Sequence, residues 1–537
     1  MKKLNFCSTT YVLITIIVIG AILRFSHINQ PFTDYIDWRQ SDVAIIADNF
    51  YRGNWNILYP ETSWNGPGEN YLGMEFQTIS YVTALLYLMV GQHDWVGRTV
   101  AVLFGLWGIF ALYKLVDRVW DREHAIISAA IMAILPGSVF VERSFIPDPV
   151  MVSLVVTSLW LLVMHFQTGL LRYLILACLV GSLGYLTKIS GLIVGIPVIY
   201  ALLTILRRRR ELNAKNLAKI SIPIFISIIP VIAYYSWAWH ISKTYPPYYL
   251  AGTGWIWENN FEYWLNEKYF LPLLYWEFNN WLWTKPVTVL LLIGLLLRSP
   301  KSDKFYGSVQ PRKHRVFDAP WFFHWWIFAG VIYYIIGAKE LMTNCWNFHI
   351  INPAVAALVA RAIIYIANLL NSVVRFPVFY PTITAIIILI LITSFKNYES
   401  MYNPPWHSDE LYELGLSLRE ISSPEDLIIT MTGSGSPIPI YYSKRRGWFF
   451  PPPGAKKWQE IVENDDKAIE IFEELRNKGA DFLGIMKHYK SRLMEKTPQF
   501  LEHIKSTCEL KKENTNWEIY QIFNPDELKN AKTKNTE

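Results

Sequence analysis

Long apolar segments recur along the first 395 residues of the chain and are separated by short polar stretches. A helix needs about 20 residues to cross the hydrocarbon core of a bilayer, and basic loops mark where such helices end. By these two criteria we predict about eleven membrane-spanning helices. The expected fold is a polytopic α-helical membrane protein, with spans at residues 8–27, 97–116, 124–141, 150–166, 170–187, 190–206, 219–239, 285–298, 320–337, 350–370 and 377–395.

One further apolar run, Phe76–Val90, is too short for an ordinary span. A run of this length lies in the membrane interface or re-enters more often than it crosses. If it did cross, every later loop would change sides and the basic run at 207–210 would be exported. We therefore expect this segment to stay at the outer surface.

The basic residues near the span ends predict the orientation of the bundle. Lys and Arg favour the cytoplasmic side of a membrane protein. They gather at the N-terminus and after the second, sixth and eighth predicted spans: Lys2, Lys3, Lys114, Arg118, Arg122, 207–210 and 298–315. The N-terminus is thus expected in the cytoplasm. The segments expected outside are 28–96, 142–149, 240–284, 338–349 and everything after the last span.

The composition changes at about Tyr398, where a charged, globular pattern of about 140 residues begins, which is a usual domain size. Strand-like runs alternate there with helical patterns. We predict two domains, a transmembrane catalytic domain over residues 1–397 and a small extracytoplasmic α/β domain over 398–537. The strands are expected at 427–430, 481–486 and 517–523, and the helices at 409–421 and 458–478.

The overall composition agrees with a membrane protein. Hydrophobic residues make up 52% of the chain and charged residues 18%, against about 25% charged in soluble domains. The 23 Trp and 31 Tyr are typical of membrane interfaces, where an apolar ring with a polar edge is favoured. The net charge of +6 forms no basic patch with interleaved aromatic residues, so nucleic acid is not an expected partner. We expect a multi-pass protein of the cell membrane.

The first outer segment carries acidic residues that could do chemistry. Asp37, Asp42 and Glu75 occur there with Arg39 and several Trp. Carboxylates beside a bilayer cost solvation energy unless they meet water, cations or hydrogen-bond donors. One interpretation is a solvated loop whose charges pair with each other, and from charge alone this is the commoner case. The other is a reactive site.

A further acid, Asp148, lies in a second outer segment, between Pro147 and Pro149 at the outer end of the third span. The two prolines fix the backbone and stop a helix from running through this point. Such a rigid turn could aim a carboxylate. The alternative is that Asp148 caps the helix that follows, which is the commoner use of an acid at this position.

A third outward cluster, with Lys339, Asn347 and His349, leads into the span that begins near Asn352. A Lys and a His at a helix start could hold a lipid phosphate, because the free backbone amides there also favour an anion. Equally, these residues could only mark the membrane interface.

Taken together, these segments resemble the polytopic glycosyltransferases of the GT-C fold, in particular the dolichyl-phosphate-mannose protein mannosyltransferase and aminoarabinose transferase superfamily. The resemblance covers most of the first 370 residues. It rests on the order and outward placement of several short motifs: Trp38–Asp42, Asn49–Tyr51, Glu75–Phe76, Gly97–Arg98, Arg143–Asp148 and Asn347–His349 before Pro353.

The resemblance implies transfer of a sugar from a polyprenyl-phosphate carrier with inversion at the anomeric carbon. A carboxylate of the first outer loop would act as general base, and a divalent metal of unknown identity is possible. Best-known members open this loop with an Asp-Glu pair where this chain has Arg39-Gln40. The base therefore stays open between Asp42, which we favour, and Asp37. The other implied site residues are Glu75 and Asp148 for the metal or the phosphate, and Arg39, Arg143, Lys339, Asn347 and His349 for the donor, with His349 also a possible metal ligand.

Three other functions compete with this one. A transporter or flippase of lipid-linked sugars would more usually carry ionisable residues within its spans and show internal repeats. A polysaccharide polymerase or ligase would use the same class of donor. A scaffold protein gives no reason for outward acids in separate loops. The acceptor, whether protein, lipid or polysaccharide, and the sugar itself are not fixed by the sequence.

Overall fold

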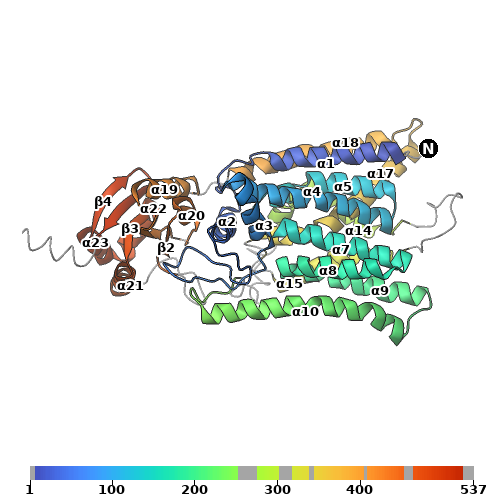
Figure 1. Cartoon of the computed structure of the whole chain (residues 1–537). Coiled ribbons are helices and arrows are strands. Elements are labelled where there is room, and N and C mark those ends of the chain that lie inside the picture. The colour runs from blue at the N-terminus through green and yellow to red at the C-terminus, as the bar shows by residue number, and fades with distance from the viewer. Residues whose placement is uncertain are drawn as a thin grey trace, which may run out of the picture.

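The structure is a computed structural model that describes residues 6–251, 275–300, 317–337, 341, 344–403, 408–433, 435–452 and 464–523. Long helices run roughly along one axis and form a bundle (Figure 1). The N-terminus lies at one end of this bundle, and a small sheet built from the C-terminal region lies beyond the other end. The two ends of the bundle therefore differ in structure, because only one of them adjoins the sheet.

All eleven segments predicted to span the membrane are helical. Among the described residues, six helices are long and apolar enough to cross a bilayer, and five further apolar helices are shorter. The polytopic helical class is thus confirmed in outline, while the number of eleven spans stays a prediction. The bundle consists of α1 (Phe6–Phe25), α4 (Asp94–Val119), α5 (Arg122–Ile134), α6 (Pro136–Val141), α7 (Asp148–Thr168), α8 (Leu171–Thr187), η1 (Ile189–Val194), α9 (Gly195–Arg208), α10 (Ala214–Thr244), η2 (Glu277–Trp281), α14 (Lys285–Leu296), α15 (Phe322–Ile336), η4 (Cys345–Ile351), α17 (Asn352–Val373) and α18 (Phe379–Tyr402).

The predicted span at 124–141 is divided into α5 and α6. Leu135 has an extended backbone and Pro136 follows as the first residue of α6. A proline cannot donate the hydrogen bond that would continue α5, but its fixed φ suits a helix start. The chain also approaches its neighbour closely at Gly137, where a Cβ atom would lie 2.9 Å from the Cα atom of Leu282. Only glycine fits this approach without a shift.

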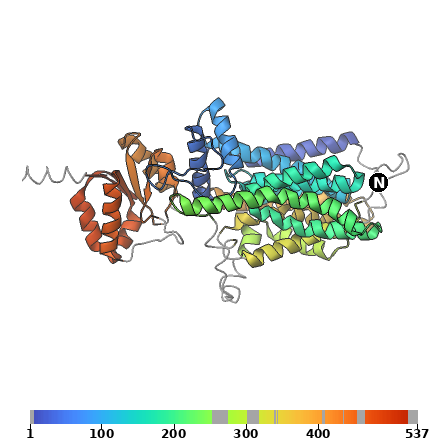
Figure 2. The same cartoon turned by 60° about the horizontal axis from the view of Figure 1, so that its bottom comes forward.

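Two short helices lie between the bundle and the sheet, and they carry the first outer segment. These are α2 (Asp37–Tyr51) and α3 (Thr78–Val90), and Figure 2 shows both steeply inclined to the long helices. The short apolar run Phe76–Val90 contains α3, a helix of 13 residues. Its apolar face is open, since Leu88 and Met89 are exposed.

The C-terminal region forms a five-stranded mixed sheet in the order β2-β1-β3-β5-β4. The predicted strands are present as β1 (Leu427–Met431), β3 (Ala480–Met486) and β5 (Trp517–Ile522), and they run along buried apolar positions. Strand β1 pairs in parallel with β2 and β3, whereas β5 is antiparallel to β3 and β4. The other elements are α19 (Ser408–Ile421), α20 (Ile438–Ser443), β2 (Arg446–Phe449), α21 (Asp465–Asn477), α22 (Lys487–Lys496), α23 (Pro498–Thr507) and β4 (Cys508–Glu513).

The sheet shares one hydrophobic core with the first outer segment. This core joins Ile46 and Phe50 of α2 and Trp64 of the following loop to Trp448 and Phe449 of β2. The domain boundary at 397/398 stays a prediction, and α18 continues past it to Tyr402. Helix α2 is thus held between the bundle and the sheet.

Candidate functional site

Asp42 lies in the middle of α2 and is 2% exposed. Its Oδ1 atom accepts a hydrogen bond from Trp64 Nε1 at 3.1 Å, and its Oδ2 atom accepts one from Arg39 Nη1 at 3.1 Å. Burial raises the pKa of Asp42, because the charged form loses its hydration, while Arg39 and the Trp64 hydrogen bond lower it. The carboxylate is therefore a stronger proton acceptor than a solvated Asp, and it has two fixed donors.

Arg39 is shared between two acids. It stands three residues before Asp42, on the same face of α2, and its other guanidinium nitrogen contacts Glu75 Oε1. The side chains of Arg39 and Glu75 keep 18% and 13% of their surface exposed. Two carboxylates around one guanidinium leave this cluster with one excess negative charge, next to a path to solvent.

Asp37 is the first residue of α2 and has different partners. Its carboxylate accepts hydrogen bonds from the backbone N–H of Trp38 and from Ser408 Oγ, the first residue of α19. The pKa of Asp37 is raised to about 6, mainly by burial and to a smaller extent by the nearby charge of Asp34, while both hydrogen bonds lower it. The two candidate bases therefore sit on one helix with separate hydrogen-bonding groups.

Asp148 faces Lys188. The Lys188 Nζ atom lies 2.8 Å from both Asp148 oxygens and donates to Asn347 Oδ1 at 2.5 Å. The suggestion that Asp148 caps α7 is wrong, because Pro147 holds the N-cap position and no side chain caps this helix. The rigid turn instead aims the carboxylate at a cation.

These two clusters are neighbours. Phe76, which follows Glu75, donates its backbone N–H to Leu186 O at 3.1 Å, and the Thr78 and Thr187 hydroxyls are 2.8 Å apart. Leu186 and Thr187 directly precede Lys188. The fold therefore brings the first outer segment, the start of α7, the turn after α8 and η4 to one place at the end of the bundle.

Arg143 lies in a sealed network around Asp34. The Oδ2 atom of Asp34 is 2.9 Å from Arg143 Nη1 and 2.8 Å from Arg98 Nη2, and Gln40 donates to Oδ1 at 2.6 Å. These four side chains are fully buried. Arg143 was expected at the donor phosphate, but here its charge is met by a desolvated carboxylate.

His349 also faces the interior. Its Nε2 atom is 3.0 Å from Glu142 Oε1 without the alignment of a hydrogen bond, and its Nδ1 atom lies 3.1 Å from Asn352 Nδ2. Arg24 Nε donates to the same Glu142 at 2.8 Å. Lys339, the remaining candidate for the phosphate, is outside the described residues.

The positions of Glu75 and Asp148 do not fit the binding of a divalent metal. Both oxygens of Asp148 are met by the Lys188 ammonium and Glu75 is met by Arg39, so protein cations stand where a metal would bind. Across the described ranges, no three His, Cys, Asp or Glu side chains gather as a metal cluster. The residues that hold a negatively charged ligand here would be Lys188 and Arg39.

Sequence reasoning missed three residues of this region. Lys188 is a single Lys in the short turn between two predicted spans, on the side predicted to be outer, and that position was a usable signal. Trp64 gave none, because Trp is abundant in the outer segments. Glu277, in the short π-helix η2, is buried, and this burial raises its pKa to about 8.

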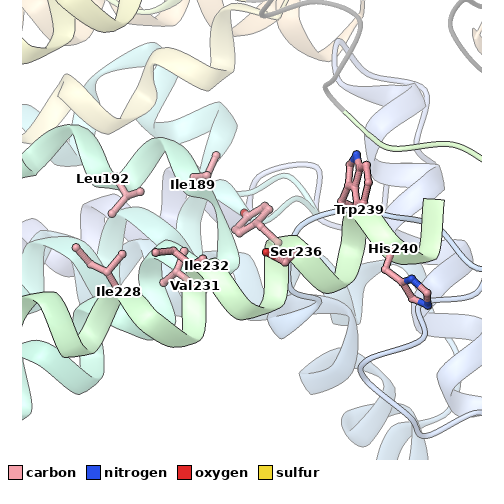
Figure 3. Close-up of a pocket in the computed structure, with 9 residues that line it drawn as sticks. Ile189, Leu192, Ile228, Val231, Ile232, Ser236, Trp239 and His240 are labelled. Atoms are coloured by element: carbon pink, nitrogen blue, oxygen red, sulfur yellow. The ribbon is translucent and has the colours of Figure 1, made fainter. Parts of the chain in front are cut away.

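An apolar groove of about 650 Å³ is lined by Ile189, the residue that directly follows Lys188. Figure 3 shows Ile189 and Leu192 of η1 facing Ile228, Val231 and Ile232 of α10. Trp239 and His240 line the groove where α10 nears the candidate site. Its walls are almost wholly hydrocarbon, which suits an isoprenoid or acyl chain rather than a polar ligand.

Comparisons with known proteins agree on one fold. A family model described as dolichyl-phosphate-mannose-protein mannosyltransferase matches residues 78–237. The structure of ArnT from Cupriavidus metallidurans in the apo state matches with a TM-score of 0.64 at 12% identity, over 97% of this chain and 99% of that one. The same protein bound to undecaprenyl phosphate matches with a TM-score of 0.62 at 12% identity, over 96% and 98%.

The archaeal oligosaccharyltransferase AglB from Archaeoglobus fulgidus is also similar. Its complex with an inhibitory peptide and a dolichol-phosphate has a TM-score of 0.55 at 13% identity, over 93% of this chain and 73% of that one. Its complex with Zn and sulfate has a TM-score of 0.58 at 14% identity, over 94% and 72%. No curated protein matches the sequence. The resemblance inferred from the sequence is thus confirmed: the chain has the GT-C glycosyltransferase fold, and residues 78–237 match the mannosyltransferase family model.

Proposed function

We propose that this protein is a membrane glycosyltransferase that moves a sugar from a polyprenyl-phosphate carrier to an acceptor hydroxyl on the outer face of the membrane. One observation carries the proposal. An acidic cluster (Arg39, Asp42, Glu75) and a lysine site (Lys188 with Asp148 and Asn347) are adjacent, and the residue after the lysine lines an apolar groove. The match to a mannosyltransferase family model and the undecaprenyl phosphate bound to ArnT support this donor class.

Asp42 is the proposed base. The acceptor oxygen attacks the anomeric carbon from the face opposite the phosphate, Asp42 takes the acceptor proton, and the bond to the phosphate oxygen breaks with its electron pair. This displacement inverts the anomeric carbon. Burial raises the pKa of Asp42 and so strengthens it as a proton acceptor, while its bonds to Trp64 and Arg39 fix its orientation. Glu75 competes for Arg39 and leaves Asp42 less fully neutralised.

Lys188 is the proposed contact of the donor phosphate. A fixed ammonium stabilises the negative charge that grows on the departing phosphate, most effectively where water is excluded. Asp148 and Asn347 hold the ammonium in place. The groove between η1 and α10 would take the isoprenoid chain, at a gain of about 25 cal/mol for each Å² of apolar surface buried.

The orientation follows from charge. The N-terminal Lys residues favour the cytoplasm, and the candidate site lies at the opposite end of the bundle, next to the C-terminal sheet. An outer location of the site and of the C-terminal domain is therefore proposed.

The test uses purified protein in detergent with radiolabelled polyprenyl-phosphate sugars and cell-envelope fractions as acceptor source. Asp42→Asn should lower transfer by about 100-fold or more, which is the usual contribution of a general base. Asp117→Asn is the matched control, because Asp117 is a partly buried acid of α4 near the end of the bundle away from the site. Asp37→Asn should keep most of the activity.

Three results would contradict the proposal. Full activity of Asp42→Asn would remove Asp42 as the base, and loss of activity in Asp37→Asn alone would move that role to Asp37. Absence of transfer from every carrier, with movement of the carrier lipid across vesicle membranes instead, would make the protein a flippase.

A further inference from the structure

Trp64 connects the acidic cluster to the C-terminal sheet. Its ring is 1% exposed and stacks on Phe449 of β2, with ring centroids 5.1 Å apart and an angle of 19° between the planes. Its Nε1–H donates to Asp42 Oδ1 at 3.1 Å. One side chain of the first outer segment thus touches both the proposed base and a strand almost 400 residues later in the chain.

The sheet holds this segment by its backbone. Strand β2 is at the edge of the sheet, and its residue Gly447 makes two backbone hydrogen bonds to the first outer segment. Gly66 N–H donates to Gly447 O at 2.6 Å, and Gly447 N–H donates to Ser63 O at 3.0 Å. Gly66 has a φ of +87°, and a Cβ atom at this position would lie 2.4 Å from the ring of Trp448. Trp64 lies between these two backbone contacts, so its position is set by β2.

Helix α20 fastens the same domain at other points. The hydroxyls of Tyr441 and Tyr442 donate to the two oxygens of Asp94 at 2.6 and 2.7 Å, at the start of α4. Lys444 Nζ lies 2.7 Å from Asp48 Oδ2 on α2. The C-terminal sheet is therefore fixed to the bundle and to α2 together, and it cannot shift without moving Trp64.

We propose that Trp64 and Phe449 are positioning residues, through which the C-terminal sheet fixes the orientation of the Asp42 carboxylate. The sheet is then a working part of the transferase site and not only an attached module. This inference rests on the proposed function, with Asp42 as the base. Neither residue has to touch the sugar.

The mechanism predicts a pH signature. The Trp64 hydrogen bond favours the charged form of Asp42, so its loss raises the pKa of this carboxyl. A hydrogen bond to a charged group contributes enough to change the protonation equilibrium by about tenfold, which is about one pH unit. The activity of a base-dependent reaction rises as the base loses its proton, so the acidic limb of the profile should move to higher pH.

The experiment compares three variants for kcat, KM and pH profile in the carrier assay. Trp64→Phe keeps the ring stack but removes the N–H, whereas Phe449→Leu keeps the N–H but removes the stack. Phe472→Leu is the matched control, because Phe472 is an equally buried aromatic residue of the same domain that packs on Phe500 and His503 of α23. Hydrogen exchange at the Gly66 and Gly447 amides reports the attachment of the sheet without reference to activity.

We expect Trp64→Phe and Phe449→Leu to lower kcat about tenfold at neutral pH, to change KM little and to move the acidic limb upward by about one unit, with the control unchanged. An unshifted limb in both variants, while the wild type transfers sugar, would overturn the positioning role alone. The same shift in Phe472→Leu would also overturn it, by showing a general loss of domain stability. Absence of transfer in the wild type would overturn the proposed function and the positioning role with it, even if both amides stay protected.

Discussion

Two carboxylates in neighbouring segments, Asp34 and Asp42, differ in the balance of positive and negative side chains around them. Asp34 is met by two guanidiniums, those of Arg98 and Arg143, and all three side chains are sealed from solvent. Asp42 shares the single guanidinium of Arg39 with Glu75, and that cluster stays partly open. The first group has one positive charge in excess, and the second has one negative charge in excess.

This difference fits a structural role for the first cluster and the proposed catalytic role for the second. A carboxylate held between two buried guanidiniums cannot leave its position without leaving both cations unpaired, at high cost. A carboxylate that competes for one cation can accept a proton, and its partner Arg39 can turn to a phosphate. The excess charge thus supports the proposal that Asp34 contributes to stability and Asp42 to the reaction.

The largest effect should come from the sealed cluster. Asp34→Asn leaves two guanidiniums buried without a counter-charge, which typically costs about 3–5 kcal/mol. We expect a large fall in thermal stability in detergent and in the yield of folded protein. Asp42→Asn is the contrasting variant, and it should unfold close to the wild-type temperature. Equal destabilisation by both substitutions would erase the distinction between the two clusters.

The next effect concerns the lysine site. Lys188→Met should lower transfer by about 100-fold, as removal of one fixed donor to a developing anion usually does. The substitution also leaves Asp148 buried without its cation, so the double variant Lys188→Met/Asp148→Asn is needed to separate folding from function. Its stability should recover while its transfer stays low. Recovery of transfer in the double variant would show that Lys188 only balances Asp148.

A smaller effect is expected in the groove. Ile228→Trp would fill part of the space between η1 and α10, and we expect it to raise KM about tenfold for a long polyprenyl-phosphate sugar, since lost burial of a few methylene groups suffices. A carrier with two isoprene units should be used almost as well as by the wild type. Equal KM changes for both carriers would place the lipid chain elsewhere.

The smallest effect tests Asp37, the other candidate base on α2. Ser408→Ala removes a hydrogen bond that lowers the pKa of Asp37, so this pKa should rise above about 6. Because Asp42 is the proposed base, the acidic limb of the transfer rate should not move. An upward shift of that limb would identify Asp37 as the base, since activity would then require deprotonation of this carboxyl.

The sequence predicted the helical segments and the acids at one end of the bundle because both follow from local patterns. Apolar runs of sufficient length form helices wherever they pack. The basic residues at the ends of the spans indicate which side of the membrane each end faces. The partner of Arg143 was not predictable in this way, because Asp34 lies 109 residues earlier and meets it only in three dimensions. The role of Asp148 depended on Lys188 in the same manner. Trp64 could be identified only from its stack on Phe449.

The pairing of Gly66 with Gly447 also has a consequence for biosynthesis. About 380 residues separate the two, so at 5–20 residues per second the ribosome needs roughly 20 to 80 seconds to supply the strand that fixes Trp64. Throughout this interval the growing chain exposes its acid-bearing loop without the support of β2. If β2 positions Trp64 as proposed, a nascent chain would use carrier lipid at least about tenfold more slowly until its last domain is made, and so would a truncated product that still inserts in the membrane.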